Sequence, residues 1–406
     1  MKRLPASLAV AVFLLGAALR LINAGTVTVR SPDEWVYTAQ AKALLDHKIE
    51  GIRAISDRYL HVDAERMFPP PTRVGFTGMI AGVMSLAGRQ DPGVGALLSC
   101  AASIFALALT IRLGWRFIDP WAGVLAGLFL AVFRPDLVIA RRTWTDAVLC
   151  CLGLGLVYCA MAIGAGARRG AILTLAALGS FALLVKEAAV SFYGLCLLWA
   201  LWSLVRRREW REAGLLVGAS AGGAIAVLGV MSWAVGGFAN VVNVALGIGP
   251  ANAANLYALQ FQTGPGYQLL QGFWIMGPLL ITLALAGMAV VLGRRAAGFH
   301  EPASILGLAM FTLVLLAIPM ILPHWLNLRY VSVIFAPLCL FAACAVVQVL
   351  RLAHRLPGKY DFTAALVVVA IILAQSSLSE YRTFERSWVQ QDPGDLSIRL
   401  ILESAK

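Results

Sequence analysis

The chain has 406 residues, of which 60% are hydrophobic and 13% are charged, and its mean hydropathy is +0.80. A soluble domain would be roughly 45–50% apolar, so the composition excludes an ordinary soluble protein and predicts membrane-spanning helices. The formal net charge is +12, but the basic residues gather in short loops between apolar runs. That distribution is typical of membrane topology and of contact with anionic lipids, and it argues against nucleic acid as a partner.

The N-terminus carries two basic residues, Lys2 and Arg3, ahead of the apolar run Leu8–Leu19. This pattern resembles a secretory signal peptide, but no small-x-small cleavage site follows it, and further apolar segments come later. We therefore interpret the run as an uncleaved first transmembrane helix with its N-terminus in the cytoplasm.

Apolar segments long enough to span a membrane recur along the whole chain. Eleven are clear in the sequence, near residues 8–22, 94–113, 121–139, 146–163, 171–185, 188–205, 213–234, 271–292, 303–322, 329–350 and 362–378. A further apolar stretch at 74–88 is ambiguous. The sequence therefore predicts about eleven transmembrane helices, with twelve as the alternative.

The short basic loops decide how the ambiguous stretch is interpreted. The positive-inside rule places these loops in the cytoplasm. With the N-terminus inside, this arrangement holds only if 74–88 does not cross the membrane. We predict that 74–88 is a re-entrant or surface-lying segment of a first outer loop that runs from about 23 to 93.

The predicted fold is an all-α polytopic membrane protein. One transmembrane domain fills residues 1–378, and its first outer loop carries juxtamembrane helices. A further outer loop lies at about 235–270, where Val241–Leu246 suits the membrane surface. A short polar tail occupies 379–406.

The stretch Ser31-Pro32-Asp33-Glu34 follows the first apolar segment and has the pattern of a helix start. Ser31 suits the N-cap, Pro32 the first helical position and Glu34 the third position of a capping box. Two interpretations stay open. Asp33 and Glu34 either serve chemistry at the membrane surface, or they only close the cap and complement the helix dipole.

The predicted topology places a set of ionisable and polar residues together on the outer face. Such residues are costly at a membrane boundary unless they are paired or functional, so the set predicts a reaction centre there. Its members are Asp33, Glu34, Arg141, Arg142, Asp146, Lys186, Glu187, His324, Arg329 and Tyr330. Structural alternatives remain: Arg141 and Arg142 also suit interfacial anchors, and Lys186 and Glu187 suit a structural ion pair.

Four places in chain order carry a resemblance to a known family. They are Asp33-Glu34-Trp35-Val36-Tyr37, Pro69-Pro70-Pro71-Thr72, the run from Arg134-Pro135 to Asp146, and the boundary motifs Val185-Lys186-Glu187 and Arg329-Tyr330. With these motifs the chain resembles the GT-C superfamily of glycosyltransferases, in the branch of protein O-mannosyltransferases and lipid A aminoarabinose transferases. The first outer loop has no Asp-x-Asp motif, which leaves a divalent metal possible and no cofactor certain.

The resemblance implies a polyprenyl-phosphate-linked sugar as the donor. The acceptor is a glycan, lipid or protein at the extracytoplasmic face of the cell membrane, a bacterial inner membrane in this interpretation. Transfer is expected to be a single displacement with inversion. Such a donor has a good leaving group, so the chemistry needs cations for the lipid phosphate and a base for the acceptor.

We assign each predicted site residue a role on this basis. Asp33 is the expected base, and Glu34 is the second catalytic residue, which orients the acceptor or holds a divalent ion. If the acceptor is itself a phosphate, no base is needed and Asp33 mainly positions it. Cations for the donor phosphate come from Arg141, Arg142, Lys186 and Arg329. Support for the acceptor or for a metal ion comes from Asp146, Glu187, His324 and Tyr330. The donor sugar, the acceptor and the oligomeric state stay open.

Two other functions compete with this hypothesis. A lipid-carrier flippase or transporter without glycosyl transfer is expected to have paired broken helices or charges near the middle of the membrane. A structural or assembly protein has no need of a one-sided cluster of charges. The polar set at one face favours the enzyme over both.

Overall fold

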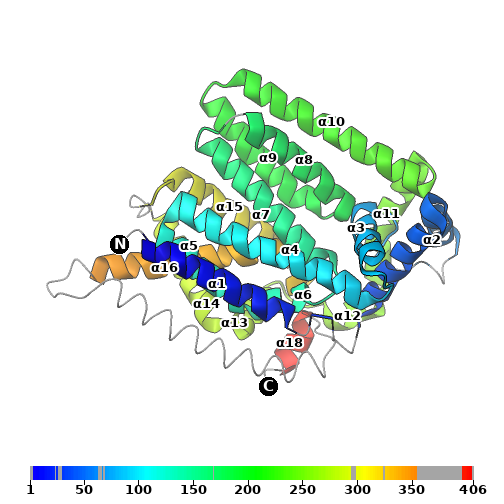
Figure 1. Cartoon of the computed structure of the whole chain (residues 1–406), viewed down its shortest axis with the longest axis horizontal. Coiled ribbons are helices and arrows are strands. Elements are labelled where there is room, and N and C mark those ends of the chain that lie inside the picture. The colour runs from blue at the N-terminus through cyan, green and yellow to red at the C-terminus, as the bar shows by residue number, and fades with distance from the viewer. Residues whose placement is uncertain are drawn as a thin grey trace.

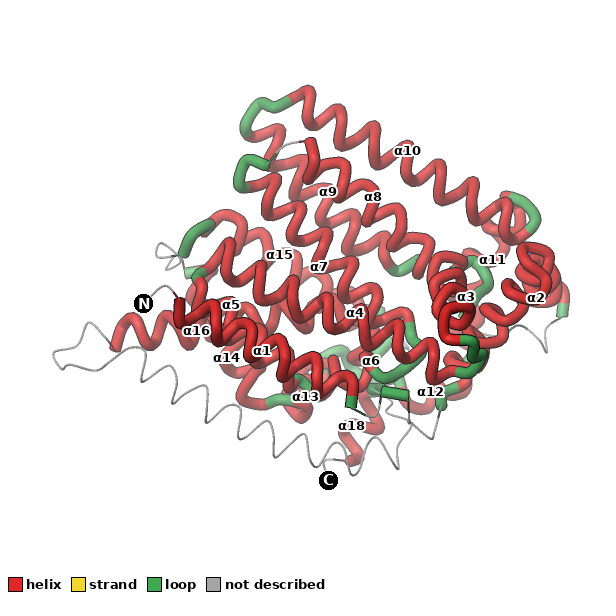
Figure 2. The backbone as a smooth tube through the Cα atoms, in the orientation of Figure 1, coloured by secondary structure: helices red, strands yellow, loops and turns green. Residues whose placement is uncertain are grey.

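The computed structural model describes residues 3–22, 24–25, 30–62, 66, 69–167, 169–293, 299–322, 325–353 and 396–404. The regular elements in these ranges are helices (Figure 2). The extended pairing among them is one isolated bridge between Asn327 and Ser397. The prediction of an all-α fold is therefore confirmed.

The first half of the chain contains the following helices, given in chain order. They are α1 (Arg3–Leu21), α2 (Pro32–His61), α3 (Val74–Ala87), α4 (Pro92–Leu113) with its π-helical end η2 (Gly114–Ile118), α5 (Pro120–Val132), α6 (Arg134–Ala140), α7 (Thr145–Gly164), α8 (Arg169–Val185) and α9 (Ala189–Arg206). The second half continues with α10 (Trp210–Val235), α11 (Phe238–Ala254), α12 (Leu256–Phe261), α13 (Gln268–Met276), α14 (Pro278–Leu292), α15 (Pro302–Ile321), the 3₁₀ turn η4 (Leu328–Ile334), α16 (Phe335–Ala353) and α18 (Ile398–Ser404).

Several of these helices are long and apolar enough to cross a membrane. In the described part of the chain there are seven by length and composition, or up to nine if each of two bent pairs is one span. The chain is thus a multi-pass membrane protein, but the predicted count of eleven is not confirmed. The predicted span at 362–378 and the tail up to residue 395 lie outside the described residues. Helix α3 has 14 residues, short of the ~20 that a bilayer requires.

Two segments that we predicted as spans, 121–139 and 271–292, are each formed by two helices with a sharp bend between them. The 121–139 segment is bent by 63° between α5 and α6, and the 271–292 segment by 117° between α13 and α14. Each break has a proline at the start of its second helix, Pro135 and Pro278. Proline lacks the N–H of the helical ladder and disfavours helical backbone before it. Gly277, the residue at the second break, has φ −172° and ψ 72°.

The predicted outer loop at 235–270 is also more regular than its composition suggests. Its Gly, Asn and Gln residues lie in and around α11 and α12 rather than in an irregular loop. The side chain of Asn255 caps α12 by accepting from the N–H of Tyr257 at 2.9 Å, which is the usual role of Asn at a helix start.

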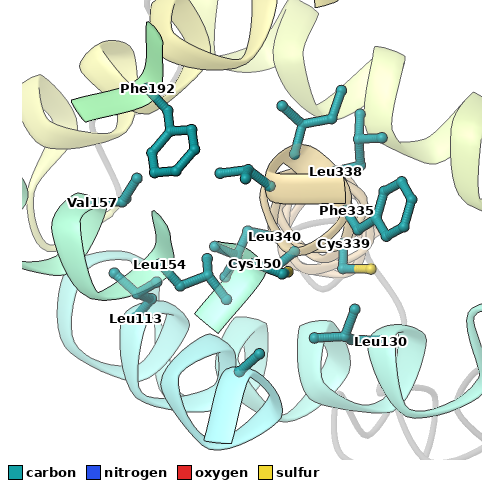
Figure 3. Close-up of a cluster of buried hydrophobic side chains, with 14 of the residues drawn as sticks. Leu113, Leu130, Cys150, Leu154, Val157, Phe192, Phe335, Leu338, Cys339 and Leu340 are labelled. Carbon is teal, nitrogen blue, oxygen red and sulfur yellow. The ribbon is translucent and has the colours of Figure 1, made fainter. Parts of the chain in front are cut away.

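The apolar core lies where α5, α7 and α16 meet. Figure 3 shows Leu130, Cys150, Leu154 and Cys339 pointing toward one another, and all of them are fully buried. Helix α14 packs closely on α16, because a Cβ atom at Gly287 would lie 1.9 Å from the carbonyl oxygen of Phe341. Small residues at such contacts let membrane helices approach one another.

Helices α7, α8, α9 and α10 run side by side, and α2, α3 and α11 gather at one end of the bundle (Figure 1). Helix α2 bends back on itself at Lys48, where the backbone has φ 55° and ψ −141°. Gly51 then lies against the carbonyl of Ala43. This helical hairpin carries Asp33 and Glu34 at its start, and the candidate site is built around that start.

Candidate functional site

The first turn of α2 presents Asp33 to a cation from the far end of the chain. The Oδ2 atom of Asp33 accepts a hydrogen bond from Nη2 of Arg329 at 3.0 Å. The two side chains are 24% and 14% exposed. Arg329 is held in place by its backbone, because its N–H donates to the Asn327 side chain that caps η4. The result is an ion pair at the edge of the bundle, within reach of solvent.

The neighbouring acid, Glu34, is fully buried. Its Oε1 atom accepts from the N–H of Ser31 at 3.0 Å and from Nη1 of Arg142 at 3.2 Å. Its Oε2 atom accepts from Nη1 of Arg30 and from the N–H of Thr143, both at 2.9 Å. The contact with Ser31 is the reach-back of a capping box. The bonds from Arg142 and Thr143 join α2 to the loop between α6 and α7, and Arg30 donates from the segment just before α2.

Trp144 connects these two acidic positions. Its indole N–H donates to the Ser31 hydroxyl at 2.9 Å. The Arg329 guanidinium lies 4.7 Å from the ring centroid and the Arg142 guanidinium 5.7 Å from it. Cations at this distance from an indole are attracted by its ring. Trp144 is buried, so it fixes both arginines relative to the start of α2.

A second ion pair continues the row of charges. Nζ of Lys186, in the turn between α8 and α9, donates to Oδ1 of Asp146 at 3.1 Å. Nζ also lies 5.2 Å from the centroid of the Tyr330 ring, and the Arg329 guanidinium lies 5.4 Å from the same centroid. Tyr330 therefore stands between the two cations, and Lys186, Tyr330 and Arg329 form one continuous group with Asp33 and Asp146.

An apolar cavity of about 200 Å³ opens beside this group. Asp146, Lys186 and Tyr330 supply its polar wall. The remaining wall is mostly apolar and comes from α9, α15 and η4, with Phe192, Leu315, Ile318, Leu322, Trp325 and Val333 among its residues. A cation at the end of an apolar pocket suits a ligand that has a charged head and a hydrocarbon tail.

Glu187 belongs to a different part of the structure. Arg73, at the start of α3, donates to both carboxylate oxygens of Glu187 and, at 2.6 Å, to the hydroxyl of Tyr37. Burial of the Glu187 carboxyl favours a higher pKa, but the Arg73 guanidinium more than offsets this and lowers the pKa. Burial also raises the pKa of Tyr37. These contacts hold α2, α3 and the α8–α9 turn together.

The remaining predicted site residues are placed as follows. Arg141 is buried, and its Nη2 atom donates to the carbonyl of Leu19 at 2.8 Å, so it points toward α1. Arg142 is also buried and is committed to Glu34 and Trp144. His324 lies outside the described residues. The structure thus brings Asp33, Asp146, Lys186, Arg329 and Tyr330 into one group, of which Asp146, Lys186 and Tyr330 line the cavity.

The described part of the chain holds no group of three or more His, Cys, Asp or Glu side chains that could bind a metal ion. Asp33 and Asp146 are each paired with a cation instead. Binding of a divalent metal stays a prediction.

Three residues that hold the site and the neighbouring contacts of α2 were missed by reasoning from the sequence. Arg30 stands four positions before Glu34, a spacing at which ion pairs form on helices, so it could have been found. Arg73 directly follows the run of prolines at 69–71. Trp144 lies between two residues that were singled out, Arg142 and Asp146, but its aromatic character alone indicated a core or lipid-facing position.

No protein-family model and no curated protein sequence matches the chain. Solved structures of membrane glycosyltransferases do match. One is the oligosaccharyltransferase AglB from Archaeoglobus fulgidus in complex with an inhibitory peptide and a dolichol-phosphate. It is 13% identical with a TM-score of 0.55, and the match covers 94% of this chain and 55% of AglB. Another is ArnT from Cupriavidus metallidurans bound to undecaprenyl phosphate. It is 16% identical with a TM-score of 0.56, covering 98% of this chain and 75% of ArnT.

At these identities the likeness shows the fold, and it confirms the predicted GT-C fold. The apo structure of the same archaeal oligosaccharyltransferase agrees, with a TM-score of 0.55 over 92% of this chain. The chain spans about half the length of the oligosaccharyltransferases that it matches.

Proposed function

We propose that the chain is a membrane glycosyltransferase that moves a sugar from a polyprenyl-phosphate donor to an acceptor at the Asp33 end of the bundle. The observation that carries this proposal is the row of Asp33, Arg329, Tyr330 and Lys186 beside an apolar cavity. The structure of ArnT with undecaprenyl phosphate, a lipid of the proposed class, supports the choice of donor.

The proposed reaction is a single displacement. The acceptor hydroxyl gives its proton to the Asp33 carboxylate while its oxygen attacks the anomeric carbon of the donor. The bond from that carbon to the phosphate oxygen breaks, and the sugar configuration inverts. Lys186 and Arg329 stabilise the negative charge that develops on the leaving polyprenyl phosphate. Cations fixed beside an apolar, poorly hydrated wall are most effective at this.

The contacts divide the four predicted phosphate-binding residues into two pairs. Lys186 lines the cavity, and Arg329 lies next to it across Tyr330. Arg141 and Arg142 are buried against Leu19 and Glu34, so we assign them to positioning the loop between α6 and α7. Glu34 is assigned to the same task, and Asp146 to holding Lys186 until the donor phosphate arrives.

The positive-inside rule supports an extracytoplasmic site, because basic residues such as Arg112, Arg206 and Arg351 lie at the other ends of α4, α9 and α16. Topology is tested by a reporter fused at residue 90. An extracytoplasmic signal is expected, and a cytoplasmic signal would contradict the assignment.

A transporter is the second candidate, because the two broken helices are a feature of transporters as well. The break between α13 and α14 consists of Gly277 and Pro278 and carries no ionisable side chain. Substrate and ion sites of transporters form at such breaks, so this one offers little for coupling.

The experiment that separates the two candidates measures transfer from a radiolabelled polyprenyl-phosphate sugar in membranes that contain the protein. With Asp33→Asn we expect transfer to fall by about 10²–10⁴-fold, the usual contribution of a general base. Asp57→Asn is the matched control, since Asp57 lies on the same helix with its side chain 75% exposed. Wild-type transfer by Asp33→Asn would refute the assignment of Asp33, and carrier translocation without any transfer by the wild type would favour the transporter.

A further inference from the structure

A second cavity lies at the opposite end of the same two helices. Its volume is about 590 Å³, and it is enclosed by the end of α7, by α9 from Leu195 to Arg207, and by α15 from Ala303 to Val314. The site cavity uses the other halves of these helices, Ala188–Phe192 and Leu315–Leu322. Both cavities therefore lie along one seam between α9 and α15, one near each end.

The wall of this second cavity is mostly apolar and suits a hydrocarbon chain. Trp199 packs closely against α15, because a Cβ atom at Gly307 would lie 2.2 Å from its indole ring. Trp202, Leu306 and Met310 also line the cavity and remain exposed. In a multi-pass membrane protein, exposed apolar side chains on helices of this kind face lipid. These exposed apolar side chains favour an opening of the cavity toward lipid over an opening toward water.

The two arginines that line the cavity, Arg206 and Arg207, differ in their contacts. Arg207 is committed, since it donates to the carbonyls of Gly164 and Ile163 at 2.7 Å each and to Glu209 at 3.1 Å. It thereby satisfies the last carbonyls of α7. Arg206 lines the same cavity and is exposed. Among the described residues it has neither an ion pair nor a hydrogen bond, so its charge is available to a ligand.

We propose that this cavity binds one anionic phospholipid of the membrane leaflet opposite the reaction centre. The acyl chains lie in the seam between α9 and α15, and the phosphate lies on Arg206. Trp202 stands at the depth of the headgroup, where tryptophan is enriched in membrane proteins. A cation next to a hydrocarbon-lined cavity selects an anionic over a zwitterionic headgroup. This proposal does not depend on the glycosyltransferase activity.

The test is native mass spectrometry of the full-length protein in mild detergent, with equal amounts of phosphatidylglycerol and phosphatidylethanolamine added. The wild type is expected to retain phosphatidylglycerol preferentially. Arg206→Ala is expected to lower that retention roughly fivefold, the usual effect of one basic residue at a lipid surface. Arg206→Lys is expected to keep it. Leu306→Trp fills the cavity without changing charge and is expected to displace both lipids.

Arg112→Ala is the matched control, because Arg112 is an exposed arginine in the last turn of α4 that does not line the cavity. Its retention of phosphatidylglycerol is expected to equal that of the wild type. The proposal is overturned if Arg112→Ala and Arg206→Ala lose lipid equally, or if the wild type binds both lipids alike. It is also overturned if the retained molecule is a polyprenyl chain, since the cavity would then hold the tail of the donor.

Discussion

Asp33 and Glu34 are neighbours in the chain, but their carboxylates lie in opposite surroundings. Glu34 has no exposed surface and accepts four hydrogen bonds, two on each oxygen. Asp33 is 24% exposed and accepts its bond from Arg329, a residue that is itself within reach of solvent. Within the same helical turn, the Glu34 carboxylate is inaccessible to solvent and the Asp33 carboxylate is accessible.

This difference in surroundings suggests a structural role for Glu34 and a chemical role for Asp33. A carboxylate with two donors on each oxygen has no room for a proton or a substrate atom, and neutralising it would remove the negative charge that Arg30 and Arg142 face. The Asp33 carboxylate is 24% exposed, so a substrate atom can reach it. We therefore expect changes at Glu34 to affect folding first, and changes around Asp33 to affect catalysis first.

The largest effect is expected from Glu34→Ala. The substitution removes the carboxylate that pairs with both Arg30 and Arg142, and breaking a buried pair costs about 3–5 kcal/mol. We expect a strong loss of folded protein after extraction into detergent, measured by gel filtration and thermal unfolding, together with loss of transfer. Glu50→Ala is the control, since the Glu50–Arg53 pair is exposed and such pairs contribute little. A folded Glu34→Ala protein with the wild-type unfolding temperature would show that the closed network is not structural.

The next largest effect is expected from a substitution at Arg329, the partner of the accessible Asp33 carboxylate. Arg329→Gln removes the cation that faces Asp33 and, in the proposed reaction, the leaving phosphate. Loss of one such group typically lowers kcat by about 10²–10³-fold. We expect a smaller fall in unfolding temperature than for Glu34→Ala, because the Asp33–Arg329 pair is partly exposed, although Arg329 also contacts the rings of Trp144 and Tyr330. Arg351→Gln is the matched control: it breaks a pair with Asp119 at 2.6 Å toward the far end of α16. Equal loss of transfer in both variants would contradict a local role for Arg329.

The contrast between the two acids explains what could be predicted from the sequence. The helix start, the all-α fold and the convergence of Asp33, Asp146, Lys186 and Arg329 follow from hydropathy, basic loops and local capping patterns. Those patterns did not distinguish Glu34 from Asp33, because the distinction depends on Arg142 and Thr143, which approach Glu34 only in the folded chain. For the same reason, the capping pattern left two interpretations of Glu34 open, a helix cap and a residue of the reaction centre.

Arg141 and Arg142 illustrate the limit in another way. Their charges at an apolar boundary predict either a ligand or a structural partner, and the choice depends on what lies across the interface. For Arg141 that neighbour is the carbonyl of Leu19, at the end of α1. The broken helices were missed because mean hydropathy does not register the local backbone effect of Pro135 or Pro278.

The smallest effect is expected at Trp144, which contacts both Arg329, the partner of Asp33, and Arg142, the partner of Glu34. Trp144→Phe keeps an aromatic face for Arg329 and Arg142 but removes the hydrogen bond to Ser31. One such bond contributes about 0.5–1.5 kcal/mol. We therefore expect a modest fall in unfolding temperature and a fall in kcat of up to roughly tenfold, with little change in the KM for the donor.

Trp144→Leu removes the ring and with it the attraction for both arginines, about 0.5–2 kcal/mol for each. If the ring positions Arg329, this variant must lose more kcat than Trp144→Phe, and the additional loss must disappear in an Arg329→Gln background. Trp35→Phe is the control, because Trp35 lies next to Glu34 on the exposed side of α2. Equal kcat for the Phe and Leu variants would show that Trp144 acts through its hydrogen bond to Ser31 alone, on the closed side of the turn.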